Sequence, residues 1–130
     1  MAREIETKCI HLEEEENSIN HYGAISYPIY QSATYAHPGV GQSTGYDYSR
    51  LQNPTREHLE KTVASLENGI DALAFSSGMA AITLMMELFK PGDHLIVDAD
   101  LYGGSIRLFN HVSEKNRIEF SSVDCHNENV

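Results

Sequence analysis

The stretch from residue 71 to residue 98, DALAFSSGMAAITLMMELFKPGDHLIVD, decides the fold that we expect for this chain. DALAFS is typical of a short buried strand, SGM of a tight turn, and AAITLMMELF of a helix with one apolar face. KPGD breaks that helix, and HLIVD is typical of a second strand. Because parallel strands need a crossover connection, this order predicts an α/β fold, with a parallel sheet and helices on its faces.

The same alternation continues toward the C-terminus. The loop ADLYGG is followed by SIRLFNHV, a predicted helix with Ser105 as its N-cap, and by RIEFSSVD (117–124), a predicted third strand. Parallel sheets usually have more strands than this and both of their faces covered. We therefore interpret the sheet as incomplete within these residues.

An amphipathic helix is predicted directly before this α/β region. Apolar residues recur at helical spacing between Leu59 and Ile70. Pro54 ends the extended segment that precedes the helix, and Thr55 is the expected N-cap. Asn68-Gly69 is the expected C-terminal stop, because both residue types accept a left-handed backbone.

Residues 1–54 show little periodicity. The first residues are polar and include the run Glu13–Glu16, so we expect a solvated helical arm or a loose terminus. Residues 21–54 are rich in Gly, Pro, Ser, Thr and Tyr, and a long irregular segment usually has a function or belongs to an interface. We therefore divide the chain into an N-terminal arm and loop segment, 1–54, and the start of a large α/β domain, 55–130.

Composition and charge narrow the class of protein. The 130 residues include 9 basic and 19 acidic ones, and the net charge of −10 disfavours nucleic acid and anionic membranes as partners. Cys9 and Cys125 form no CxxC pair, the start has no apolar signal segment, and the longest apolar run is too short for a bilayer. We expect a cytoplasmic protein, and the spacing of its histidines predicts no metal site.

A first group of hydrogen-bond donors suited to an anion lies in AFSSGMAAI (74–82). The amides of Gly78 and Met79 would open a helix whose dipole favours a phosphate, and Ser76 and Ser77 add hydroxyl groups. The alternative is an ordinary turn between a strand and a helix, capped by serine.

Two further segments carry candidate binding residues. GYDYSRLQNPTR (45–56) places two arginines in an acidic chain, and Tyr48 and Arg50 together suit a phosphate or carboxylate. The alternative is a surface arginine stacked on a tyrosine.

Tyr102, in DLYGGS, follows a predicted strand at the sheet edge where α/β folds bind ligands. Its flanking glycines keep the ring accessible, and the alternative is a tyrosine that only packs.

Taken together, YDYSRLQNPTR, SSGMAAI and DLYGGS, in this order and spacing, resemble the Cys/Met-metabolism family of pyridoxal-phosphate (PLP) enzymes. This family includes cystathionine γ-synthase, the cystathionine lyases and methionine γ-lyase. The resemblance begins near residue 18, where YGAISYPIYQSATY is similar to the family's N-terminal segment. It implies the aspartate-aminotransferase-like fold, PLP fold type I.

The resemblance also implies roles for the candidate residues. Residues 77–79 would hold the phosphate of pyridoxal 5′-phosphate, and Tyr102 would stack on the cofactor ring and act in proton transfer. Tyr48 and Arg50 would reach across a dimer interface to the cofactor phosphate of the partner subunit. The expected assembly contains identical subunits, in a tetramer.

One part of the family pattern does not occur in the 130 residues. The family holds PLP through a lysine in a Ser-x-Thr-Lys-like stretch, and none of the lysines here lies in one. The resemblance therefore indicates the N-terminal portion of a PLP-dependent carbon–sulfur lyase or transferase. Such an enzyme acts on a sulfur amino acid such as cystathionine, by γ-replacement, γ-elimination or β-elimination, and we expect the isolated chain to be inactive.

Two other hypotheses stay open at the level of sequence. The chain could be a non-catalytic interaction protein that docks on a full-length PLP homologue and lends it Tyr48 and Arg50. It could also be a free-standing α/β module that binds phosphate.

Overall fold

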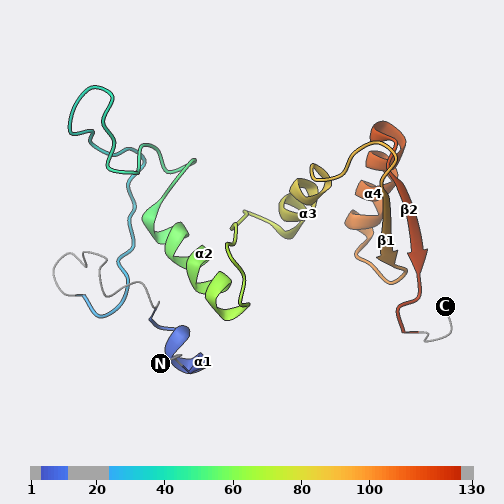
Figure 1. The fold of residues 1–130 in the computed structure, drawn as a ribbon, viewed down its shortest axis with the longest axis horizontal. Helices are drawn as coiled ribbons and strands as arrows, with labels where there is room; N and C mark the ends of the chain where they lie inside the picture. Colours follow the sequence, from blue (N-terminus) through green and yellow to red (C-terminus); the bar gives the residue numbers. More distant parts are fainter. Residues whose placement is uncertain (1–3, 12–23, 127–130) are drawn as a thin grey trace. The chain divides into compact units, whose positions relative to one another are not determined.

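The computed structural model describes residues 4–11 and 24–126 (Figure 1). The expectation for Glu13–Glu16 lies outside these residues. The elements are, in order, α1 (Ile5–Lys8), α2 (Pro54–Leu66), α3 (Gly78–Met86), β1 (His94–Asp98), α4 (Gly103–Asn116) and β2 (Glu119–Val123). Among the described residues, no helix combines the length and the apolar character that crossing a membrane requires.

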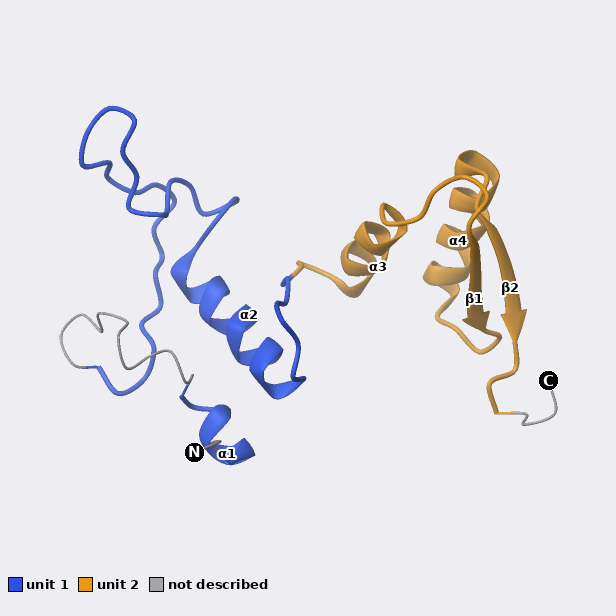
Figure 2. Cartoon of the chain, viewed as in Figure 1, with its two compact units in different colours: residues 1–74 blue, residues 75–130 orange. Residues whose placement is uncertain are grey.

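The chain forms two compact units, residues 1–74 and residues 75–130, which we call unit 1 and unit 2 (Figure 2). Unit 1 contains α1, α2 and, among the described residues, the irregular segment 24–53. Unit 2 contains α3, α4 and both strands. The functional boundary that we expect after residue 54 stays a prediction.

Helix α2 forms where the sequence predicts a helix, but it begins at a different cap. The Asn53 side chain accepts hydrogen bonds from the amides of Thr55 and Arg56, with Pro54 at the first helical position. The expectation of Thr55 as N-cap was wrong, because Asn is a strong N-cap residue and Pro suits the position after it. The Thr55 hydroxyl instead bridges to the arm, where it donates to the Pro28 carbonyl oxygen (3.1 Å) and accepts from the Tyr30 amide (2.8 Å).

The stop at the end of α2 is confirmed. Asn68 has a left-handed backbone with φ of 54°. The Gly69 amide then donates to the Ala64 carbonyl oxygen at 2.8 Å, which satisfies one of the last carbonyl groups of the helix.

Unit 2 confirms the α/β expectation. Strands β1 and β2 pair in parallel, with His94 opposite Glu119, and α4 is the crossover between them (Figure 1). Helix α4 starts earlier than expected, with Tyr102 as its N-cap. Ser105, the expected cap, is instead buried inside the first turn of the helix at 4% exposure.

The segment DALAFS is the exception, because it forms no strand in the part of the chain that the structure describes. A strand needs a neighbour for its backbone groups, and among the described residues β1 pairs with β2 only. Side chains satisfy some of these amides instead: the Ala74 amide donates to Glu60 Oε1 (2.8 Å) and the Ala72 amide to Asp71 Oδ1 (2.9 Å). The expectation of a strand at 71–76 was therefore wrong.

The apolar core of unit 2 lies between its helices and its strands. Its buried members are Met86 of α3, Phe109 of α4 and Ile118, which precedes β2. Partly buried residues of both helices and both strands pack around them. The core fixes α3 against α4, and this packing positions the site described next.

Candidate functional site

The first turn of α3 presents backbone amides that lack an acceptor. Ser77 is the N-cap, and its hydroxyl accepts from the Ala80 amide at 3.2 Å. Its carbonyl oxygen accepts the first helical bond, from the Ala81 amide. The amides of Gly78 and Met79 have no hydrogen-bond acceptor among the described residues, as expected for a first turn.

This turn is also open and free of negative charge. No acidic residue lies in the first turn of α3. A Cβ atom at Gly78 would meet no heavy atom within 4 Å. The first turn of α3 therefore combines a helix dipole, two amides without an acceptor among the described residues and open space at Gly78, which together suit a phosphate or carboxylate.

Tyr102 lies beside this turn. A Cβ atom at Gly104 would lie 2.5 Å from Cε1 of Tyr102 and 3.3 Å from Sδ of Met79. The Ser105 hydroxyl also contacts Met79 Sδ, at 3.8 Å. Of the predicted residues 77–79, the structure brings the Met79 side chain close to Tyr102, and Tyr102 is 72% exposed.

Gly104 is a residue of this site that the sequence interpretation noted only as one of the glycines flanking Tyr102. The Tyr102 ring occupies the space where a side chain at Gly104 would stand. The available signal was the second glycine of DLYGGS, because adjacent glycines permit close approach of a ring to the backbone.

Tyr48 and Arg50 form a second group, in unit 1. The guanidinium carbon of Arg50 lies 5.1 Å from the centre of the Tyr48 ring, which is a cation–π contact. The Arg50 guanidinium has neither a hydrogen bond nor an ion pair with any described residue, and both side chains are exposed. The structure therefore brings the two predicted residues together and leaves their polar groups open to a ligand.

Arg56 behaves differently from Arg50, although both belong to the same motif. Its guanidinium donates to the carbonyl oxygens of Ser49 (3.0 Å) and Leu51 (2.5 Å). Its Nε lies 3.6 Å from Glu60 Oε1. These groups occupy the hydrogen-bond donors of the Arg56 guanidinium, whereas the Arg50 guanidinium has no such acceptor among the described residues.

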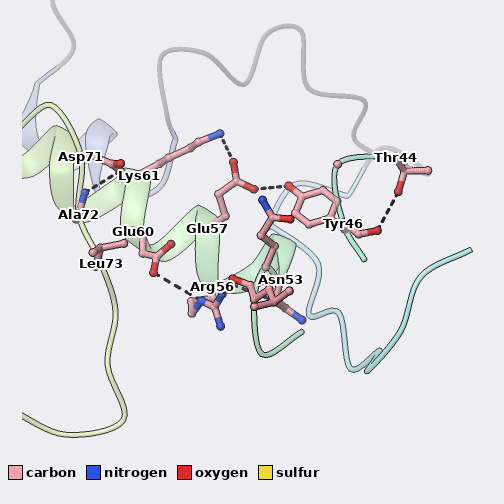
Figure 3. Close-up of a pocket in the computed structure, with 13 residues that line it drawn as sticks. Thr44, Tyr46, Asn53, Arg56, Glu57, Glu60, Lys61, Asp71, Ala72 and Leu73 are labelled. Atoms are coloured by element: carbon pink, nitrogen blue, oxygen red, sulfur yellow. Dashed lines mark hydrogen bonds and ion pairs between the residues drawn. The ribbon is translucent and has the colours of Figure 1, made fainter. Parts of the chain in front are cut away.

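A pocket of about 550 Å³ lies beside α2 in unit 1 and holds a charged network (Figure 3). The Tyr46 hydroxyl donates to Glu57, and Lys61 Nζ lies 2.7 Å from Glu57 Oε1. Hydrogen bonds from Lys61 and then Tyr46 lower the pKa of Glu57, whereas burial and the Glu57 carboxylate raise the pKa of Tyr46. The Glu57–Lys61 pair was visible as an i,i+4 spacing, but nothing in the sequence placed Tyr46 beside it.

The family described as Cys/Met metabolism PLP-dependent enzyme matches residues 6–130 of the chain. The chain is 48% identical over 130 residues to the cystathionine γ-synthase/O-acetylhomoserine (thiol)-lyase of Bacillus subtilis, covering 96% of this chain and 34% of that protein. It is 46% identical over 126 residues to the cystathionine β-lyase of Coxiella burnetii, covering 96% and 32%.

Solved structures give the same result. The crystal structure of cystathionine γ-synthase from Xanthomonas oryzae pv. oryzae in complex with aminoacrylate and cysteine matches with a TM-score of 0.83 and 34% identity, over 98% of this chain and 33% of that one. Cystathionine γ-lyase from Lactobacillus plantarum, complexed with L-serine, matches with a TM-score of 0.77 and 41% identity, over 94% and 31%. The chain therefore spans about a third of the length of these relatives.

Proposed function

The chain belongs to the Cys/Met metabolism PLP-dependent enzyme family, and we propose that it forms the phosphate-binding part of a carbon–sulfur lyase or transferase. The observation that carries the proposal is the first turn of α3, where the amides of Gly78 and Met79 have no acceptor among the described residues and the Met79 side chain lies near the exposed Tyr102 ring. These residues fit the cofactor, because the amides suit its phosphate and the ring suits its flat pyridine.

Within this function the residues of unit 2 bind and orient. The α3 amides hold the phosphate, and the Tyr102 ring stacks on the pyridine, with its hydroxyl available to accept or release a proton. PLP, when bound, supplies an electron sink for charge that develops on the substrate. Because no carboxylate lies in the first turn of α3, nothing there opposes the phosphate charge.

Tyr48 and Arg50 serve the cofactor phosphate of a second subunit in this proposal. The proposal is supported by the open guanidinium of Arg50 and the exposed Tyr48 side chain, which together offer two guanidinium N–H groups and one hydroxyl to an anion. A charge-assisted hydrogen bond from a planar guanidinium is strong enough to select phosphate over neutral groups.

The substrate in this proposal is a sulfur amino acid. The solved relatives from Xanthomonas oryzae hold cystathionine, or aminoacrylate and cysteine. The reaction is a γ-replacement, γ-elimination or β-elimination, with a cystathionine γ-synthase or lyase the favoured member. Because none of its lysines lies in a Ser-x-Thr-Lys-like stretch, we expect the 130-residue chain by itself to be inactive.

The test compares the affinity of the chain for PLP and for pyridoxal, which lacks the phosphate, by equilibrium dialysis. We expect PLP to bind about tenfold more tightly or better, because the α3 amides act on the phosphate alone. Equal affinities for the two compounds would contradict the proposal.

A pair of matched variants places the phosphate at α3. Gly78→Asp adds a carboxylate in the first turn, where a Cβ atom meets no neighbour and an acidic residue favours the helix. We expect it to lower PLP affinity by about tenfold through like-charge repulsion. Thr83→Asp adds the same charge further along α3, at an exposed position, and should leave most of the affinity.

A further inference from the structure

The start of α2 holds the loop that carries Tyr48 and Arg50. Asn53 uses both ends of its amide: Oδ1 accepts the two helical amides that it caps, and Nδ2 donates to three groups outside the helix. These three are the Tyr30 carbonyl oxygen (3.1 Å), the Tyr35 hydroxyl (3.2 Å) and the Ser49 hydroxyl (3.0 Å). Ser49 is the residue between Tyr48 and Arg50, so the cap is tied directly to the loop.

Arg56 holds the same loop one turn further along the helix. Its two terminal nitrogens donate to the carbonyl oxygens of Ser49 and Leu51, the residues on either side of Arg50. The planar guanidinium suits this paired contact, which a lysine ammonium cannot reproduce. The Arg56 side chain is 33% exposed, and Glu60, 15% exposed, balances its charge.

A third contact holds the other end of the loop. Figure 3 shows the Tyr46 ring directed at Glu57, with Lys61 on the opposite side of that carboxylate. Residues 46–51 are thus tied to α2 before Tyr48 and after Arg50. Inside this frame the Arg50 guanidinium has no hydrogen-bond or ion-pair partner of its own among the described residues.

We propose that Asn53 and Arg56 are positioning residues, which fix residues 46–51 so that Tyr48 and Arg50 keep their stacked arrangement and present their donors to an anion. The identity of that anion as a cofactor phosphate rests on the proposed function. The positioning itself rests only on the contacts within unit 1. Rigid presentation matters because an arginine that is ordered only on binding loses side-chain entropy, which weakens the complex.

Two variants remove the hydrogen bonds that hold residues 46–51 and keep the N-cap of α2. Asn53→Asp keeps an acceptor for the Thr55 and Arg56 amides, since Asp caps as well as Asn, but it loses the three Nδ2 contacts. Arg56→Gln removes the paired contact to the loop carbonyl oxygens. Gln52→Glu and Lys115→Gln are the charge-matched controls, the first beside the loop and the second on α4 in the other unit.

The readout is limited trypsin proteolysis after Arg50, with hydrogen exchange of the peptide that spans residues 46–52, both followed by mass spectrometry. We expect cleavage after Arg50 and hydrogen exchange in residues 46–52 to rise about tenfold in Asn53→Asp and in Arg56→Gln, because a loop that is fixed by hydrogen bonds resists both processes. The controls should match the parent chain. The amide of Glu67, which bonds to the Val63 carbonyl oxygen at the end of α2, should exchange as before in all four variants.

Three results would overturn the proposal. The first is unchanged cleavage after Arg50 in both Asn53→Asp and Arg56→Gln. The second is an equal loss of protection from hydrogen exchange at the Glu67 amide, which would mean that α2 itself unfolds. The third is full recovery in Arg56→Lys, which would show that charge and not the paired geometry holds the loop. Because no PLP is present in these experiments, they stand or fall independently of the PLP-binding test.

Discussion

The two glycines that follow Tyr102 differ in the space around them. A Cβ atom at Gly103 meets no heavy atom within 4 Å, whereas one at Gly104 would stand 2.5 Å from the Tyr102 ring. Because Tyr102 is 72% exposed, its ring can move aside at little cost in stability. A methyl group at Gly104 would therefore displace the ring without unfolding the chain.

We expect Gly104→Ala to weaken PLP binding several-fold and to change the free energy of unfolding little. The lost ring contact is worth about 1 kcal/mol by the scale of aromatic stacking. Gly103→Ala is the matched control and should bind as the parent chain does. Equilibrium dialysis of both variants checks this, and equal weakening by the two substitutions would count against a placed ring.

Arg50 and Arg56 show what sequence can and cannot assign to single residues. Both are arginines of one motif, and the sequence interpretation assigned an anion site to Arg50, with Tyr48, and no separate role to Arg56. The structure separates them by their acceptors: Arg56 donates to two backbone carbonyl oxygens, and Arg50 has no acceptor among the residues that the structure describes. Carbonyl groups of a folded loop leave no signature in the sequence, so this difference was not predictable.

At the scale of elements, the N-cap of α3 stabilises the same helical turn that forms the proposed phosphate site. The Ser77 hydroxyl accepts from the Ala80 amide, and the unpaired amides of Gly78 and Met79 lie within the turn that this bond closes. We expect Ser77→Ala to cost about 1 kcal/mol of unfolding free energy, measured by urea denaturation. Ser76→Ala, one residue earlier and outside the cap, should stay within about 0.5 kcal/mol of the parent chain. Equal losses would mean that the hydroxyl does not cap the helix.

The network beside α2 predicts a pH dependence of unit 1. Hydrogen bonds from Lys61 and Tyr46 hold the pKa of Glu57 below its ordinary value of 4.5. A carboxyl with a lowered folded-state pKa stabilises the fold above its unfolded-state pKa, and this contribution is lost as the pH falls through the folded-state value. The effect is modest, since Glu57 is 38% exposed.

We therefore expect Glu57→Gln to be less stable than the parent chain near neutral pH and equal to it in acid. Urea denaturation between pH 7 and pH 3 measures the difference, over about the range in which a carboxyl titrates. Glu114→Gln removes the same charge from α4, and its difference in stability from the parent chain should not depend on pH in this way. A difference in unfolding free energy between the parent chain and Glu57→Gln that stays constant down to pH 3 would refute the role of the ionised carboxylate.

The elements themselves were largely predictable, and the failure at DALAFS has a physical cause. Helices α2, α3 and α4 depend on local periodicity, which a sequence displays, although the N-caps expected for α2 and α4 differ from the observed Asn53 and Tyr102. A strand depends on a neighbour, and residues 71–76 have no strand partner in the described chain. The apolar pattern that suggested a strand remains, with Leu73 at 65% and Phe75 at 40% exposure.

For the whole molecule, the described chain leaves much apolar surface uncovered. In unit 2, Leu84, Met85 and Leu88 are exposed on and just after α3, and Ile96 is exposed on β1. Few of the described side chains are buried, so much apolar surface remains in contact with water and could be buried by association. Exposed apolar side chains that gather on a surface favour association in soluble proteins.

We expect the 130-residue chain by itself to self-associate in a concentration-dependent way, because burying this surface between copies lowers the free energy. Size-exclusion chromatography with light scattering measures the mass across a dilution series. Met85→Lys combined with Leu88→Lys should shift the mass toward the monomer, since charged residues cannot be buried cheaply in the contact. Val40→Lys, at an exposed arm position outside unit 2, should leave association as it was. A parent chain that stays monomeric at every concentration and unfolds in one sharp transition would show that the exposed apolar face is tolerated in water.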